Sequence, residues 1–514
     1  MLLDLKTNSV EQKRWSNFLK YLSFFFMFGG IVLRLSQYLN NRSFWFDEVS
    51  LALNIVERSY GELVQTLDYN QAAPLGFLWI EKLSTQIFGE NEYAMRLFPL
   101  LSSIVAIFAF YQLVRRYSST FAAPMAIALF AFGRCTLYYA TELKQYSSDV
   151  AIVLILCLCL IPIRRQILET QQIIWLSLLG GLSIWFSHPA IFALAGLECG
   201  YLLTSASKQR QRIVINRIAI YLTWIVSFGV FYFVTITNTL KNADLASSWE
   251  SRYPTSFFDI VWFFDALGRF FYKPMGFYWI TDAVGMVAFV LGCIACYRFS
   301  RDTFIAMIAP FIATMIASYL HKYPFRERLV LFLAPLAMLL VAEGLVFLLA
   351  KFRQRSKYSW ITGMIGLVFS GALLIPTVSH SSQFMIHPEF IQEMRPAMEY
   401  IAAHHQPGDS IYVHYKAIPA FNYYTREFDN LQQDYILGDD ALSGEHASLP
   451  EELELFASDI EPLLGKQRVW FVFRADGIEE TTAVNYMNQI AKQIDSFKPP
   501  GIFVYLYDLS SSER

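Results

Sequence analysis

The sequence predicts a polytopic α-helical membrane protein with a small soluble α/β domain at its C-terminus. Of its 514 residues, 55% are hydrophobic, 17% are aromatic and only 16% are charged, whereas an ordinary soluble domain is about 25% charged. The 45 Phe and 29 Tyr residues would be hard to bury in one water-soluble core, but they suit a lipid environment. The formal net charge of −2 gives no reason to expect a nucleic acid partner.

Apolar runs of about 20 residues, the length that crosses a membrane, predict eleven transmembrane helices. These runs cover residues 18–39, 93–114, 119–134, 145–163, 171–187, 189–205, 213–237, 279–297, 303–320, 328–350 and 358–379. Five alternate loops are short and basic, namely 115–116, 164–165, 208–212, 298–301 and 351–357. Basic loops stay on the cytoplasmic side, so we expect a cytoplasmic N-terminus. The odd number of spans then puts residues 380–514 on the outer side of the plasma or inner membrane.

The first outer loop, residues 40–92, contains two apolar stretches that are shorter than a span. Val49, Ala52, Leu53 and Val56 have helical spacing, and Asp47 with Glu48 would open that helix. The second stretch, residues 74–89, begins with a proline that suits a first helical turn. We expect both helices to lie flat at the outer membrane surface.

The chain changes character after the predicted membrane domain, residues 1–383. Residues 384–514 alternate apolar and polar side chains, with strand-like segments at 409–415, 468–475 and 501–509 and a helical segment at 387–405. This pattern predicts a small soluble α/β domain of about 130 residues. It contains no cysteine, so we expect it to fold without disulfides.

Polar and ionisable residues near the outer surface are the candidate functional residues, because charges at membrane depth are costly and usually functional. They are Arg34, Asp47, Glu48, Gln71, Arg96, Glu142, Lys144, Tyr146, Asp149, His188, His321, Arg326 and Arg328. Residues 321–328 are basic although the outer side should carry few positive charges, so we expect an anionic ligand there. A phosphate at the level of the lipid headgroups would suit arginine and lysine.

An acid on the first outer loop could act as the general base for an acceptor hydroxyl or amine. Asp47 and Glu48 together could also hold a divalent cation, which two adjacent acids permit without requiring it. Structural interpretations stand beside these. Asp47 and Glu48 could simply favour the start of a helix, and Glu142 could pair with Lys144. Arg326 and Arg328 could extend their charged ends toward the membrane interface.

Five segments resemble the C-type membrane glycosyltransferases, above all the branch related to protein O-mannosyltransferases and lipid A aminoarabinose transferases. The segments are "WFDEVSLALNIVERSYGEL", "QAAPLGFLWIEKLSTQIFGENEYAMRLFPLLSSI", "YYATELKQYSSD", "HPAIFALAG" and "YPFRERLVLFLAPL". The resemblance covers residues 18–379. Its most specific part is the combination of the Asp-Glu pair, the proline-led helix and "RLFP" at these spacings.

The resemblance implies that Asp47 lies at the reaction centre, as the base or as a residue that positions the acceptor, with Glu48 beside it. It further implies a donor sugar on a polyprenyl phosphate, whose phosphate is held by Arg326 or Arg328 and by Lys144. Where many relatives have two prolines or a lysine, this chain has Ala72-Ala73-Pro74, and Gln71 is the candidate substitute. Glu142 is a further candidate acid and Arg96 a further phosphate ligand. Asp149, His188, His321, Tyr146 and Arg34 remain as other candidates.

The expected function is therefore transfer of a sugar from a polyprenyl-phosphate donor to a lipid, glycan or protein acceptor at the outer face. A single displacement would invert the anomeric carbon. The main alternative is a transporter of lipid-linked oligosaccharides, and a second alternative is a receptor or scaffold that acts through residues 384–514. Transporters often place charges near the bilayer midplane and contain repeats. This sequence collects its charges at the outer rim and shows no visible repeat.

Overall fold

The computed structural model describes residues 9–353, 359–386, 388–432, 435–439, 449–475 and 478–510. The chain divides into two compact units. We call Met1–Asn40 with Arg58–Pro388 the membrane unit, and Asn41–Glu57 with Glu389–Arg514 the C-terminal unit. The sequence-based boundary lay at residue 383, whereas the compact units divide at residue 388 and assign residues 41–57 to the C-terminal unit.

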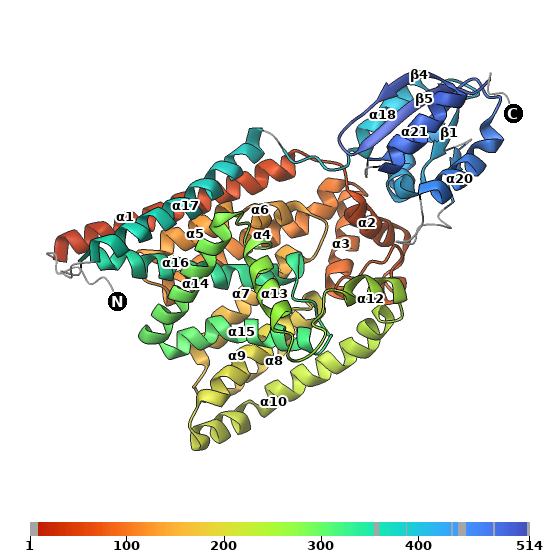
Figure 1. The fold of residues 1–514 in the computed structure, drawn as a ribbon. Coiled ribbons are helices and arrows are strands. Elements are labelled where there is room, and N and C mark those ends of the chain that lie inside the picture. The colour runs from red at the N-terminus through yellow and green to blue at the C-terminus, as the bar shows by residue number, and fades with distance from the viewer. Residues whose placement is uncertain are drawn as a thin grey trace. The chain divides into compact units, whose positions relative to one another are not determined.

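The membrane unit is helical (Figure 1). Its helices are α1 (Ser9–Leu39), α3 (Leu75–Phe88), α4 (Glu92–Tyr117), α5 (Ala122–Phe132), α6 (Arg134–Tyr138), α7 (Tyr146–Ile163), α8 (Thr170–Phe186), α9 (Ala190–Thr204), α10 (Ser207–Phe231), α11 (Thr237–Thr239), α12 (Ala243–Glu250), α13 (Ile260–Tyr272), α14 (Ile280–Phe299), α15 (Arg301–Tyr319), α16 (Ala334–Leu349) and α17 (Ser359–Ile386). A 3₁₀ segment, Glu327–Leu333, leads into α16.

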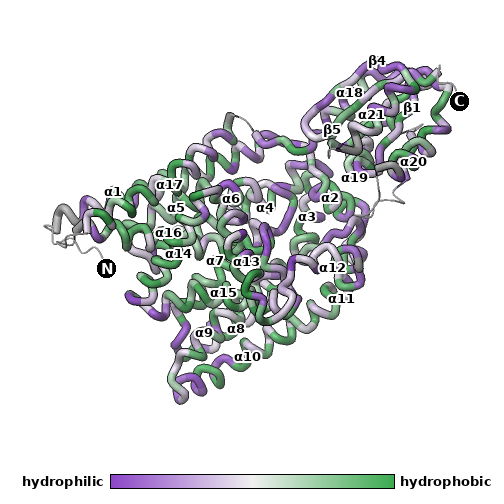
Figure 2. The backbone as a smooth tube through the Cα atoms, in the orientation of Figure 1, coloured by the Kyte–Doolittle hydropathy of each residue, from purple (hydrophilic) through white to green (hydrophobic). Residues whose placement is uncertain are grey.

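Eight helices in the described part of the chain are long and apolar enough to cross a membrane. They coincide with eight of the eleven predicted spans. The other three predicted spans, 119–134, 171–187 and 189–205, fall on the shorter helices α5, α8 and α9. The structure thus confirms a polytopic helical protein, while the count of eleven spans stays a prediction. Figure 2 shows the hydrophobic residues that run along these helices.

Small residues bring α14 and α16 into close contact in the core of the membrane unit. A Cβ atom added to Gly292 would overlap the carbonyl oxygen of Leu340, and one added to Gly344 would overlap that of Ala288. Helices that associate in lipid often meet through such small residues, because their backbones can then approach closely. α16 is buried along nearly its whole length, so it forms the centre of the bundle.

Both short helices expected in the first outer loop are present. The first is α2 (Phe46–Glu57), which carries Asp47 and Glu48 in its first turn. The second is α3, and Pro74 precedes its first residue with an extended backbone (φ −60°, ψ 137°). Proline therefore stands one position earlier than expected, where its fixed φ suits the residue that opens the helix.

The C-terminal unit is built on a five-stranded sheet of order β2-β1-β3-β5-β4. Its elements are α2, α18 (Met394–His404), β1 (Ser410–Val413), α19 (Ile418–Tyr424), β2 (Tyr435–Leu437), α20 (Leu449–Ile460), β3 (Val469–Arg474), α21 (Ile478–Ile490), β4 (Lys492–Phe497) and β5 (Ile502–Asp508). Strand β1 is parallel to β2 and β3, whereas β5 is antiparallel to β3 and β4.

Helices cover both faces of this sheet. Phe471 of β3 packs with Phe456 of α20 and Met487 of α21 on one face. Tyr400 of α18 contacts Trp470 on the other face, with ring centroids 6.3 Å apart. The sequence indicated β1, β3 and β5 but not β2 and β4, which are the two edge strands. Edge strands are often short or polar, so their apolar signal is weak.

Candidate functional site

Backbone strain gathers on the loops that the sequence places outside. Within the described residues, the non-glycine residues with positive φ are Asn41, Tyr69, Asn70, Trp279, His321 and Glu327. All six lie on or beside predicted outer loops. Three of them adjoin or coincide with candidates, because Asn70 precedes Gln71, Glu327 separates Arg326 from Arg328, and His321 is itself a candidate. Strained backbone of this kind costs free energy and tends to occur where function requires it.

Four candidates form two pairs in the membrane unit, and Lys144 and Tyr146, two residues apart in the chain, connect the pairs. Nζ of Lys144 donates a 2.5 Å hydrogen bond to Oε1 of Gln71, and Nε2 of Gln71 donates to the carbonyl oxygen of Tyr69. The guanidinium of Arg328 lies 5.7 Å from the ring centre of Tyr146. Tyr146 opens α7, two residues after Lys144. We call Gln71, Lys144, Tyr146 and Arg328 the outer-loop cluster.

Acidic residues lie close to the outer-loop cluster along the chain. Glu142 and Asp149 are both buried, and the amide of Lys144 donates to the carbonyl oxygen of Glu142 over 2.7 Å. Burial raises the pKa of Tyr323, and the nearby side chains of Asp149 and Tyr146 raise it further. Tyr323 therefore stays protonated and can donate a hydrogen bond, which it gives to the carbonyl oxygen of Leu329.

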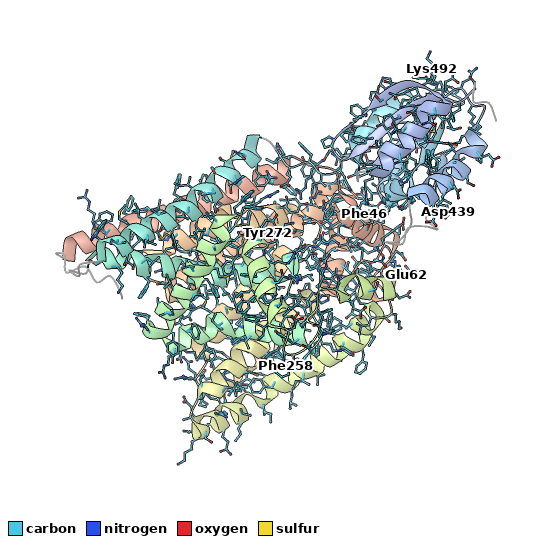
Figure 3. All side chains as sticks on the ribbon, viewed as in Figure 1. Phe46, Glu62, Phe258, Tyr272, Asp439 and Lys492 are labelled. Carbon is cyan, nitrogen blue, oxygen red and sulfur yellow. The ribbon has the colours of Figure 1, made fainter. Side chains whose placement is uncertain are left out.

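Arg326 is oriented by a partner on α13. Its Nη2 atom lies 2.6 Å from Oδ2 of Asp265, and the side chain is only 10% exposed. Its Nη1 atom is buried and makes no hydrogen bond. Burial alone would raise the pKa of Asp265, but hydrogen bonds from Arg269 and Arg326 hold it below its usual value. Tyr272, labelled in Figure 3, is the last residue of this helix, and Phe258, also labelled, lies two residues before its first residue.

His321 and His188 are held in different surroundings. The ring of His321 stacks on that of Tyr253 at 4.9 Å, and its Nε2 atom lies 2.9 Å from the carbonyl oxygen of Pro254. His188 lies at the turn between α8 and α9, next to Phe231. Burial lowers the pKa of His188 to about 4, so its imidazole is neutral at pH 7 and carries no charge for a phosphate.

Two candidate arginines lie within the helices. Arg34 is fully buried. It donates to Oγ of Ser103 over 2.6 Å and to the carbonyl oxygens of Gly30 and Ala131, and thereby joins α1, α4 and α5. Arg96 is buried in the second turn of α4. The contacts of Arg34 do not connect it to the outer-loop cluster.

Asp47 and Glu48 belong to the C-terminal unit, because α2 lies in residues 41–57. Backbone hydrogen bonds from Glu48 and Val49 to the carbonyl oxygen of Trp45 form the first turn. Among the described residues, no group of three or more His, Cys, Asp and Glu side chains could hold a metal ion. A divalent cation on Asp47 and Glu48 stays a prediction.

Sequence reasoning missed two residues of chemical interest. Asp265 orients Arg326, but in the sequence it looks like any acid on an amphipathic loop helix. Glu81 of α3 is fully buried, and neither of its carboxyl oxygens has a hydrogen-bond partner. Burial raises the pKa of Glu81 well above its usual value. The sequence did contain a signal for Glu81. It follows Phe77 by four residues and so lies on the apolar face of a predicted interfacial helix.

Comparison with known proteins gives a family match for part of the chain. Residues 72–236 match the family model described as dolichyl-phosphate-mannose-protein mannosyltransferase. This segment spans α3 to α10 and includes Lys144, Tyr146 and His188. A comparison with curated protein sequences found no match.

Solved structures give a match over nearly the whole chain. The oligosaccharyltransferase of Archaeoglobus fulgidus, in complex with Zn and sulfate, aligns with 93% of this chain and 72% of its own at 13% identity and a TM-score of 0.51. The chain has the C-type glycosyltransferase fold. The resemblance seen in the sequence is thus confirmed at the level of fold.

Two further proteins of the C-type glycosyltransferase fold align with this chain. ArnT from Cupriavidus metallidurans, bound to undecaprenyl phosphate, aligns with 96% of this chain and 98% of its own at 12% identity and a TM-score of 0.49. The arabinofuranosyltransferase AftD from Mycobacteria aligns with 96% of this chain and 40% of its own at 12% identity and a TM-score of 0.46.

Proposed function

We propose that this protein is an integral membrane glycosyltransferase that takes a sugar from a polyprenyl-phosphate donor and passes it to a lipid, glycan or protein acceptor. The reaction takes place on the outer face of the membrane. The family match and the fold support the class of reaction. The archaeal relative has been solved with a dolichol phosphate and an inhibitory peptide, which are a lipid phosphate and a peptide ligand of the kinds expected here.

The observation that carries the proposal is the arrangement of Arg326. Asp265 orients its guanidinium through one nitrogen, while Nη1 is buried and makes no hydrogen bond. Buried donors are nearly always paired, so this donor calls for an acceptor, and a phosphate oxygen suits an arginine well. We assign Lys144 and Arg328 of the outer-loop cluster as further cations for the same anion, and Gln71 orients Lys144 by accepting its hydrogen bond.

In the proposed reaction, a hydroxyl or amine of the acceptor attacks the anomeric carbon of the donor. Asp47 accepts the proton of the attacking group, and Glu48 lies next to it in the chain. The bond from the anomeric carbon to the phosphate oxygen breaks, and the polyprenyl phosphate leaves as an anion that needs no protonation. One displacement inverts the anomeric carbon. The protein contributes the base, the phosphate ligands and the orientation of both substrates.

The proposal is tested with the purified full chain in lipid vesicles and a panel of polyprenyl-phosphate hexoses and pentoses. Release of polyprenyl phosphate is measured, because it is common to every donor. We expect release with at least one donor in the presence of a membrane extract that supplies acceptors. Failure with every donor would contradict the proposal. Movement of intact donor across the vesicle membrane without release would instead support a transporter.

Asp47→Asn is the variant that tests the base. We expect it to lower the rate of release about 100-fold or more, the usual contribution of a general base. The matched control is Asp68→Asn, which removes another acid of the first outer loop. The Asp68 side chain is 61% exposed and pairs with Arg58. If Asp47→Asn releases polyprenyl phosphate at the wild-type rate, Asp47 is not the base.

A further inference from the structure

The residue that precedes α2 cannot cap this helix with its own side chain. The first N–H groups of a helix lack partners inside the helix, and Ser, Thr, Asp or Asn normally caps them. The residue before α2 is Trp45, whose side chain contains no oxygen and cannot accept a hydrogen bond. The segment that carries Asp47 therefore has to find acceptors elsewhere.

Residues about 350 positions later provide those acceptors. The amide of Phe46, the first residue of α2, donates to Oε1 of Gln392 over 2.7 Å. The amide of Phe44 donates to the hydroxyl of Tyr424 over 2.7 Å. The amide and hydroxyl of Ser43 both donate to the carboxylate of Glu393. All of these bonds lie inside the C-terminal unit.

Packing and charge strengthen the same junction. The guanidinium of Arg474 lies 4.5 Å from the ring centre of Phe46, which is labelled in Figure 3. Phe44 and Tyr423 meet edge to face with centroids 5.4 Å apart. At the other end of α2, Glu57 forms an ion pair with Arg426. Contacts from residues 392–393, α19 and β3 thus hold the start of this helix, and Arg426, in the turn that follows α19, holds its end.

Two of the acceptor residues are themselves fixed within the C-terminal unit. The amide of Glu393 donates to the carbonyl oxygen of Pro500 over 2.8 Å, at the turn between β4 and β5. Tyr424 is fully buried at the end of α19. The position of α2 therefore depends on residues that belong to the C-terminal unit.

We infer that residues 389–514 cap and orient the helix that carries Asp47, with Gln392 and Tyr424 as positioning residues for this acid. The C-terminal unit then has a role in the reaction, because it orients the segment that carries the base. The catalytic part of this inference rests on the proposed function. The structural part does not.

Four variants test the inference by hydrogen–deuterium exchange of the peptide that covers residues 43–57 in the full chain. Gln392→Met removes the acceptor at similar length, whereas Gln392→Glu keeps an acceptor oxygen. Tyr424→Phe removes one hydroxyl, and Tyr507→Phe is its matched control, because Tyr507 is equally buried but bonds to Asn488 of the same unit. We expect Gln392→Met and Tyr424→Phe to speed exchange about threefold to tenfold, as the loss of one hydrogen bond predicts.

Gln392→Glu and Tyr507→Phe should leave this peptide near the wild-type rate. The inference is overturned if Gln392→Met and Tyr424→Phe leave exchange unchanged, or if Tyr507→Phe speeds it equally, which would indicate general loosening of the unit. Should Tyr424→Phe fail to fold, the half-buried Gln392 still decides the question.

Kinetics with polyprenyl-phosphate donors supply the second readout. We expect Gln392→Met to lower kcat while the KM for the donor is unchanged, and Gln392→Glu to restore kcat. A rise in donor KM at constant kcat would refute the positioning role. If the wild-type chain itself releases no polyprenyl phosphate, the proposed function fails, and the exchange experiment still decides whether residues 389–514 anchor α2.

Discussion

At the scale of single residues, the chemistry depends on how individual charges are partnered. Arg326 and Arg269 both pair with Asp265, yet they differ in burial. Arg326 is 10% exposed and keeps one buried nitrogen without a hydrogen bond, whereas Arg269 is 61% exposed. A buried, oriented cation binds an anion more strongly than an exposed one, because water screens it less.

This difference makes Arg326→Gln and Arg269→Gln a matched pair. We expect Arg326→Gln to raise the KM for a polyprenyl-phosphate donor about tenfold, the effect of losing one hydrogen bond to a charged group. Arg269→Gln should change it little. Steady-state kinetics at several donor concentrations measure the effect. Equal donor KM values for the two variants would contradict the assignment of Arg326 as a phosphate ligand.

Glu81 gives a prediction about pH. Burial raises the pKa of Glu81 well above its usual value, so the folded chain keeps the proton to a higher pH than the unfolded chain does. The unfolded state then binds fewer protons, and the free energy of unfolding falls as the pH rises above the usual pKa of glutamate, about 4.3. Glutamine has the same shape but does not ionise.

Glu81→Gln should therefore raise the melting temperature at pH 8 and raise it less at pH 5. Melting curves of the detergent-solubilised protein between these values provide the measurement. The control is Glu62→Gln, because Glu62 is exposed and hydrogen bonds from Ser59 lower its pKa. A melting temperature for Glu81→Gln below that of the wild type at every pH would contradict the protonated state.

At the scale of elements, the contact between α14 and α16 depends on having no side chain at Gly292. A Cβ atom there would overlap the carbonyl oxygen of Leu340, and this oxygen belongs to the backbone of α16, so it cannot rotate away. The two helices would have to separate. Overpacking of this kind typically costs about 1–3 kcal/mol.

Gly292→Ala should accordingly lower the melting temperature and the yield of monodisperse protein in detergent. Gly229→Ala is the matched control, since a Cβ atom at Gly229 of α10 meets nothing within 4 Å. Differential scanning fluorimetry and size-exclusion chromatography compare the two variants. The close contact would be refuted if both glycine variants melted at the wild-type temperature.

At the scale of the whole molecule, the basic loops predict that the chain beyond residue 383 lies outside the cell membrane. Lys492 and Arg301 are both exposed, and the predicted topology places them on opposite sides. In a chain whose six cysteines are replaced by serine, Lys492→Cys should react with a membrane-impermeant maleimide in sealed cells. Arg301→Cys should react only after the membrane is broken. The reverse labelling pattern would show that the chain has the opposite orientation in the membrane.

Much of the membrane unit was predictable because each membrane-spanning helix needs a continuous run of apolar residues, which can be recognised in the sequence. Eight predicted spans coincide with long apolar helices, since each needs about 20 apolar residues in a row. The helices that contain residues 46–57 and 75–88 were also predictable from their apolar spacing. The edge strands β2 and β4 were not, because short or polar strands depend on their neighbours for stability.

The sequence by itself determined the class of fold, the run of membrane helices and the set of polar residues in the predicted outer loops. These follow from hydropathy and charge, which each segment carries alone. Only the tertiary structure decided which of those residues meet. Lys144 bonds to Gln71, and Arg326 forms an ion pair with Asp265. The first residue of α2 contacts Gln392 and Arg474. Such pairings depend on chain segments that are far apart in the sequence. A local sequence pattern therefore does not show which distant residue a side chain will contact.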